Sequence, residues 1–85
     1  MAGCAPIQFQ DVTRGRFNCL QQAANQQLNV ILKGDSGLAS DPGGTNTISW
    51  DFDEPTWVLT LQATETPFPC FIVNSKIKSF VQSCP

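Results

Sequence analysis

The chain has 85 residues, with five Lys and Arg, seven Asp and Glu, no His and four Cys. That length allows one domain, which we expect to span residues 1–85, with a core small enough to benefit from covalent cross-links. The lack of His excludes a Ser-His-Asp triad and any His metal ligand. We therefore expect a protein that is not an enzyme and that needs no cofactor or metal.

The net charge of −2 and the sequence pI of about 4.6 argue against nucleic acid as a partner. A phosphate-binding face needs clustered Lys and Arg, and this chain has only the pairs Arg14/Arg16 and Lys76/Lys78. Its apolar runs are three or four residues long, far below the length of about 20 that crosses a bilayer. We expect no membrane span.

The four cysteines, Cys4, Cys19, Cys70 and Cys84, are widely spaced and include no Cys-x-x-Cys pair. In a small, Lys-poor chain this pattern is typical of disulfides and of an oxidising compartment, so we expect a secreted or periplasmic protein. Four reduced thiols in a cytosolic protein are the alternative. Residues 2–4, Ala-Gly-Cys, also resemble the end of a bacterial lipobox, which would place a lipid on Cys4 and leave three cysteines.

Four cysteines allow three pairings. We favour Cys4–Cys19 with Cys70–Cys84, because each bond then joins near neighbours in the sequence. Cys19–Cys84 with Cys4–Cys70 is the main alternative.

The first half of the chain predicts one helix between two extended segments. Residues 1–10 favour a short edge strand or strap, and residues 12–27 a helix with Asp11 as its N-cap. Residues 28–33 are rich in β-branched side chains and predict a strand. The turn-forming residues that follow predict a long loop over residues 34–45.

The second half begins with the strongest strand signal in the sequence. Apolar side chains alternate with polar ones on both sides of a turn at residues 53–55, which predicts a β-hairpin with one aromatic-rich face. The apolar positions of that face are Ile48, Trp50, Phe52, Trp57, Leu59 and Leu61.

The C-terminal part predicts a strand at residues 70–73 and then a short helix, capped by Asn74 or Ser75. A strand over the same final residues is the alternative. The whole order predicts the α+β class: one N-terminal helix packed on an antiparallel sheet of three to four strands, a short C-terminal helix, and disulfides that cross-link them.

The loop after residue 33 is the first candidate binding site. We expect it to present Asp35, Ser36 and Leu38 to a protein partner, as exposed, cross-linked loops do in small inhibitors. Its Gly-Asp-Ser-Gly letters also occur around the nucleophile of chymotrypsin-like proteases, but this chain has no His for Ser36 to use. A mobile connection without function is the alternative.

The two tryptophans are the second candidate site. Trp50 and Trp57 would stack on sugar rings if exposed, although their place on the apolar face favours burial. The nearby carboxylates of Asp51, Asp53 and Glu54 lack the spacing of a calcium loop, and we interpret them as a solvated turn.

These observations predict a small secreted or periplasmic, non-enzymatic binding module that contacts another protein, as an inhibitor or an effector. The alternative is a carbohydrate-binding module that uses Trp50 or Trp57.

Overall fold

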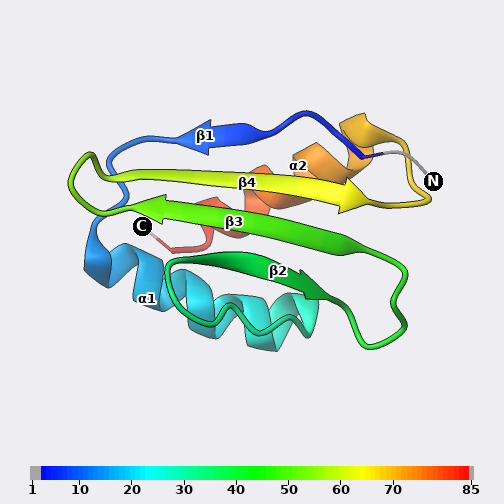
Figure 1. The fold of residues 1–85 in the computed structure, drawn as a ribbon, viewed down its shortest axis with the longest axis horizontal. Coiled ribbons are helices and arrows are strands. Elements are labelled where there is room, and N and C mark those ends of the chain that lie inside the picture. The colour runs from blue at the N-terminus through cyan, green and yellow to red at the C-terminus, as the bar shows by residue number, and fades with distance from the viewer. Residues whose placement is uncertain (1–2, 85) are drawn as a thin grey trace.

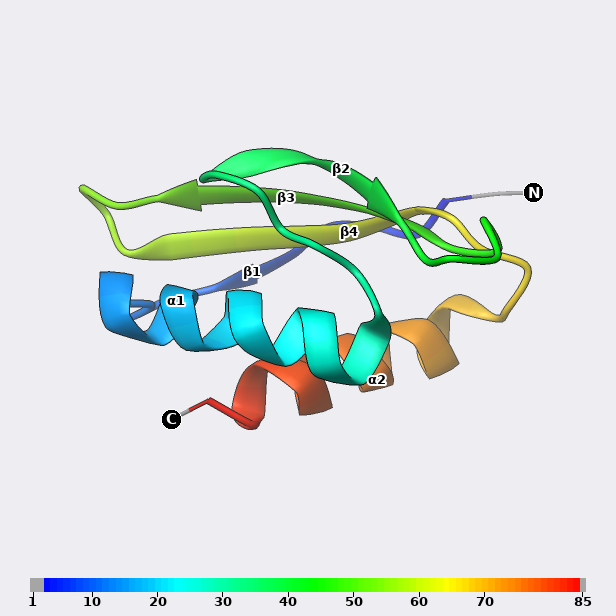
Figure 2. The ribbon, with the colours of Figure 1, turned by 90° about the horizontal axis from the view of Figure 1, so that it is seen from below.

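Two helices lie side by side on one face of a four-stranded antiparallel sheet and leave its other face open (Figures 1 and 2). The computed structural model describes residues 3–84. In chain order the elements are β1 (Ile7–Phe9), α1 (Arg14–Ala23), the π-helical segment η1 (Ala24–Leu28), β2 (Ser36–Ser40), β3 (Thr47–Asp53), β4 (Val58–Glu65) and α2 (Cys70–Gln82). The strand order is β1-β4-β3-β2. This is the α+β architecture that the sequence predicts.

Period-two alternation in β3 and β4 determines which face of the sheet is covered. Trp50 pairs with Leu61 and Phe52 with Leu59, and all four side chains are buried beneath the helices. The residues between them, such as Ser49 and Gln62, form the open polar face. The predicted hairpin is therefore confirmed, and β1 lies beside β4 as the predicted short edge strand.

Helix α1 begins later than predicted, and Thr13 caps it instead of Asp11. The Thr13 backbone is extended, and its hydroxyl accepts a hydrogen bond from the Arg16 N–H at 3.2 Å. Asp11 instead has a left-handed backbone, with φ of 60°. The helix packs on the sheet through Phe17, whose ring stacks on that of Phe52 at a centroid distance of 4.5 Å.

The strand predicted at residues 28–33 is absent, although the side chains of residues 30–32 alternate between buried and exposed positions. Val30 and Leu32 are buried, and Ile31 between them is exposed. The backbone here does not pair with a strand: the Val30 N–H donates to the Ala24 carbonyl at 3.2 Å, and the Leu32 carbonyl accepts from Gln21 Nε2 at 2.9 Å. The strand forms instead at Ser36–Ser40, within the predicted loop, because the edge of β3 offers it a partner.

The strand predicted at residues 70–73 is also wrong, since these residues form the first turn of α2. Pro69 stands at the N-cap, and Val73, Ile77 and Phe80 continue a helical spacing that buries one face against the core. Phe71 remains 77% exposed, so the aromatic and β-branched residues of this segment do not mark a buried strand.

The disulfides pair Cys4 with Cys70 and Cys19 with Cys84, so the favoured near-neighbour pairing is wrong and the alternative is right. The Cα atoms lie 5.5 and 6.0 Å apart, within the normal range for a disulfide. The reason is topological: α2 runs antiparallel to α1 and ends beside it, while its first residue lies beside the strap before β1 (Figures 1 and 2). Both ends of α2 are therefore cross-linked, and the Cys4 sulfur belongs to one of these bonds.

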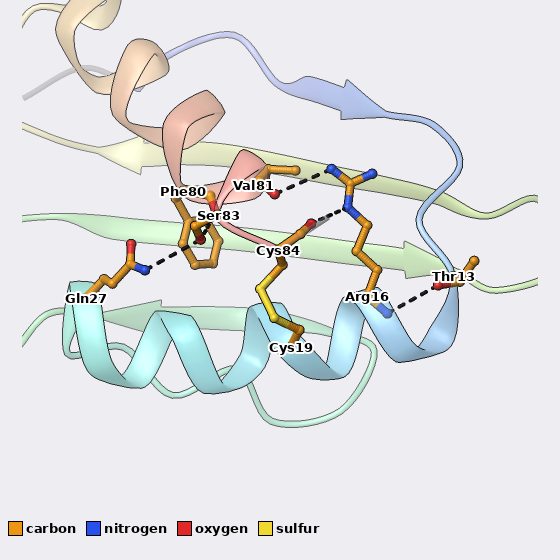
Figure 3. The surroundings of a disulfide bond; sticks show 8 residues. All are labelled: Thr13, Arg16, Cys19, Gln27, Phe80, Val81, Ser83 and Cys84. Carbon is orange, nitrogen blue, oxygen red and sulfur yellow. Dashed lines mark hydrogen bonds between the residues drawn. A yellow bond between two sulfur atoms is a disulfide. The ribbon is translucent and has the colours of Figure 1, made fainter.

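Arg16 fixes the same end of α2 by hydrogen bonds (Figure 3). Its Nε donates to the Cys84 carbonyl at 2.8 Å, and its Nη2 to the Val81 carbonyl at 3.4 Å. The Val81 carbonyl belongs to the last turn of α2 and the Cys84 carbonyl lies just past its C-cap, where the helix dipole favours a positive charge. Arg16 therefore lies on the side of α1 that faces α2, beside the Cys19–Cys84 bond.

Candidate functional site

The free edge of the sheet at β2 contains two of the three binding residues predicted from the sequence. Ser36 and Leu38 belong to β2, which pairs with β3 on one side only. Leu38 is 67% exposed and lies on the open face of the sheet, opposite Ser49. The predicted exposure of Ser36 and Leu38 is thus correct, but they lie on a regular strand and not on a loop.

The backbone of β2 directs alternate residues to the free edge. The Asp35 carbonyl accepts from the Phe52 N–H at 2.7 Å, and the Asp41 N–H donates to the Asn46 carbonyl at 3.1 Å. Because bonding alternates along an antiparallel pair, Ser36, Leu38 and Ser40 direct their N–H and C=O groups away from β3. Within residues 3–84, no backbone bond beyond those of the sheet reaches β2.

This edge lacks the features that usually protect a sheet. Edge strands commonly carry Lys or Pro, or they bulge, which prevents another strand from pairing. Residues 36–40 read Ser-Gly-Leu-Ala-Ser, with no charge and no Pro, and their register with β3 is continuous. The geometry suits the addition of an extended segment as a fifth strand.

The third predicted residue, Asp35, is held in an ion-pair network with Arg14 and Glu54. Arg14 donates to both carboxylate oxygens of Asp35, at 2.7 and 2.9 Å, and to Glu54 at 2.9 and 3.2 Å. These hydrogen bonds hold the pKa of Asp35 and of Glu54 below their ordinary values, and they raise the pKa of Arg14. The Arg14 guanidinium also lies 5.0 Å from the ring centroid of Phe52. Asp35 therefore anchors the start of β2 to α1 and to the hairpin turn.

The acidic residues of that turn do not form a shared site. Glu54 bonds to Arg14, while Asp53 accepts from the Thr56 hydroxyl at 2.8 Å. Within the described residues, no three carboxylate or Cys side chains are placed to hold a metal ion.

The two tryptophans have opposite environments. Trp50 is buried at 4% exposure, and its Nε1 donates to the Gly34 carbonyl at 3.2 Å. Trp57 is half exposed, because it lies in the turn before β4 with a left-handed φ of 56° that breaks the alternation. Burial of Trp50 is therefore as predicted, and the place of Trp57 on the apolar face is wrong.

A hollow that the sequence analysis did not predict lies between α2 and the end of the sheet. It has a volume of about 250 Å³ and is lined mostly by apolar side chains, with Asp41, Asn46 and Lys76 as its polar members. Phe68 and Ile72 line it while remaining 52% and 41% exposed. The one available signal was the apolar run around Pro67 and Pro69, which fits no alternating pattern. The apolar members are Leu28, Val30, Ile48, Ala63, Phe68, Ile72, Val73 and Ile77.

Neither helix in the described part of the chain has the length and apolar character of a bilayer-spanning helix. Comparisons with protein-family models, with curated proteins and with solved structures found no match for this chain.

Proposed function

We propose that this protein is a small, exported binding module that captures an extended segment of another protein along β2. The observation that carries the proposal is the free, uncharged edge formed by Ser36, Leu38 and Ser40. Main-chain hydrogen bonds along such an edge supply affinity, and alternate side chains supply specificity. Leu38 would be the specificity contact, since it is the one large apolar side chain on β2.

A preformed edge lowers the entropic cost of binding, and two contacts hold this one in place. The Arg14–Asp35 ion pair fixes the start of β2, and the hydrogen bond between the Ser40 and Thr47 hydroxyls fixes its end. Both disulfides also support an oxidising location, secreted or periplasmic. An inhibitor or an effector are the two roles that fit such a module.

Charge favours a different protein over a second copy of this chain. An antiparallel copy of β2 centred on Leu38 would place Asp35 opposite Asp41 at both ends of the pairing. Like charges directly opposite each other destabilise a strand pair. A partner segment with Lys or Arg at these two places would be attracted instead.

The test is selection of short random peptides on the immobilised, disulfide-bonded protein, followed by amide hydrogen exchange of the complex. We expect the selected peptides to protect the N–H groups of Ser36, Leu38 and Ser40 from exchange. Leu38→Lys should weaken their binding by tenfold or more, on the order of the 1.4 kcal/mol that a buried apolar contact contributes. Thr60→Lys is the matched control, because it adds the same charge on the open face of β4, away from the edge.

Peptides that bind without protecting β2, or that bind Leu38→Lys as well as the unsubstituted chain, would refute this proposal. A selection in which no peptide is enriched from the library would also refute it.

Carbohydrate binding through Trp57 is the second candidate, and the half exposure of this ring favours it. Trp50 is too deeply buried to stack on a sugar. Titration with oligosaccharides should shift and enhance the fluorescence of Trp57, and Trp57→Ala should abolish the change. An unchanged emission spectrum across a broad oligosaccharide panel would remove this candidate.

A further inference from the structure

We propose that the hollow between α2 and the end of the sheet binds a small amphiphilic anion, a medium-chain carboxylate. Its alkyl chain would fill the apolar pocket, and its carboxylate would lie on Lys76. This site is separate from the β2 edge and does not depend on the function proposed for that edge.

The size and lining of the pocket suit an alkyl chain. An engineered cavity of about 150 Å³ holds benzene, so a volume of about 250 Å³ suits a ligand of about ten non-hydrogen atoms. The walls come from separate elements: Leu28 ends η1, Ile48 and Ala63 lie on β3 and β4, and Ile77 lies on α2. Apolar walls offer water no hydrogen-bond partners, and they therefore favour an apolar occupant.

The polar groups of the pocket select the charge of the ligand. Asp41 is already satisfied: its Oδ1 accepts from the Thr45 N–H at 2.8 Å and the Asn46 N–H at 3.4 Å, and its Oδ2 from Asn46 Nδ2 at 3.1 Å. These donors, with the Asn46 side chain first, keep the pKa of Asp41 below its ordinary value and offset its charge. Asn46 Oδ1 in turn accepts from the Thr66 hydroxyl at 2.6 Å.

Lys76 is the polar member that has no such partner. Both ion pairs within residues 3–84 belong to Arg14, and the Lys76 ammonium group makes no hydrogen bond within these residues. Its ammonium group can therefore accept a carboxylate without breaking an existing contact.

A shallower depression adjoins the pocket and shares Leu28 and Lys76 with it. Its other walls include Ser75 and Ser79, whose hydroxyls can donate to an anion, and Gln27. Lys76 thus lies where a mostly apolar pocket meets a depression of mixed lining, which includes Phe80 beside these polar groups. That arrangement matches the two halves of an amphiphilic anion.

The rim of the pocket gives a ligand further apolar surface to cover. Phe68 and Ile72 line the pocket and remain half exposed, and Phe71 beside them is 77% exposed. Contiguous exposed apolar surface at the rim of a hollow is typical of ligand-binding grooves.

The experiment compares octanoate with octylammonium, which has the same chain and the opposite charge. Each is titrated into the disulfide-bonded protein at neutral pH and low salt, with the amide NMR shifts of Ala63 and Ile77 and calorimetry as readouts. We expect octanoate to bind about fivefold or more tightly than octylammonium, since reversing the charge replaces an ion pair by a repulsion. Lys76→Met should remove that preference.

Lys78→Met is the matched control, because Lys78 lies on the same helix with the same charge and lines neither hollow. It should leave the preference for octanoate unchanged. The proposal fails if octylammonium binds as tightly as octanoate, if Lys76→Met keeps the preference, or if neither compound shifts the two amides. Peptide binding at β2 is measured separately, so failure here leaves the edge proposal standing.

Discussion

The indole ring of Trp50 lies against the backbone of Gly37, its partner across β2 and β3. A Cβ atom at position 37 would lie 3.1 Å from the ring, closer than nine in ten real Cβ contacts. The ring is buried, and its Nε1 is held by the Gly34 carbonyl at 3.2 Å. Glycine at position 37 therefore lets the edge strand cover the tryptophan.

We expect Gly37→Val to lower the free energy of unfolding by about 1–3 kcal/mol, because the held indole cannot move away from the added methyl groups. Urea denaturation followed by Trp fluorescence measures the change. Gly15→Ala is the control, for which we expect the opposite sign: apart from its chain neighbours and the backbone of its own helix, no atom lies within 4 Å of the added methyl group. In α1 it should raise stability by about 0.5–1 kcal/mol. Equal stability of Gly37→Val and the unsubstituted protein would show that the contact is not tight.

Arg16 should stabilise the end of α2. Arg16→Met keeps the length of the side chain but removes the donor of the Cys84 carbonyl, and it leaves the Val81 carbonyl with the Cys84 N–H as donor. We expect a loss of about 1–2 kcal/mol, the usual cost of removing a charged hydrogen-bond partner. Lys78→Met removes an equal charge from α2 without such bonds and should change stability little. A loss of the same size in both variants would assign the effect to net charge instead.

Where the sequence prediction succeeded, the signal was local. Alternation in β3 and β4 needs only neighbouring residues, and it correctly predicts the buried positions of Trp50 and Phe52. The helical spacing of Ile77 and Phe80 is equally local, and it correctly places a helix at the C-terminus.

The predictions failed where contacts between residues distant in the sequence determine the structure. Val30 and Leu32 have the burial pattern of a strand, but the Leu32 carbonyl accepts a hydrogen bond from the Gln21 side chain and not from a neighbouring strand. The pairing of Cys19 with Cys84 depends on the direction of α2, which no local pattern reveals. The pocket beside Lys76 is likewise built from five separate parts of the chain, so its lining cannot be recognised in any one segment.

The Arg14 network should make stability depend on acid. Hydrogen bonds from Arg14 lower the pKa of Asp35 and Glu54 from their ordinary values of 3.8 and 4.5 in the folded protein. A lowered folded pKa contributes stability that is fully present above the ordinary value and is lost as the pH falls through the folded one. We therefore expect the urea midpoint to be steady down to about pH 5 and to fall below it.

Arg14→Met should reduce this acid dependence while keeping an aliphatic stem over Phe52. Some dependence should remain, because hydrogen bonds from Asn46 lower the pKa of Asp41 in the same direction. Lys33→Met, which removes a cation outside the network, is the control and should keep the full dependence. An acid profile identical in Arg14→Met and the unsubstituted protein would contradict the role of the network.

The disulfide connectivity can be determined by one digestion. Trypsin cleaves after Arg14, Arg16, Lys33, Lys76 and Lys78, so it places each cysteine in a different peptide. The structure predicts that residues 1–14 remain joined to 34–76, and residues 17–33 to 79–85, in the unreduced digest. Near-neighbour pairing would instead join 1–14 to 17–33 and 34–76 to 79–85. The cross-linked peptides of the two pairings have different masses, so mass spectrometry distinguishes them.

Each bond closes a long loop, with sequence separations of 66 and 65 residues. Chain-entropy arguments then give each one about 4 kcal/mol of stability. We expect the double variants Cys4→Ala/Cys70→Ala and Cys19→Ala/Cys84→Ala each to lose stability on that order. Because the Cys19→Ala/Cys84→Ala variant retains the Arg16 bonds to the end of α2, adding Arg16→Met there should release the end of the helix, seen as loss of amide protection at position 84. Protection that survives both changes would mean that core packing alone holds α2 in place.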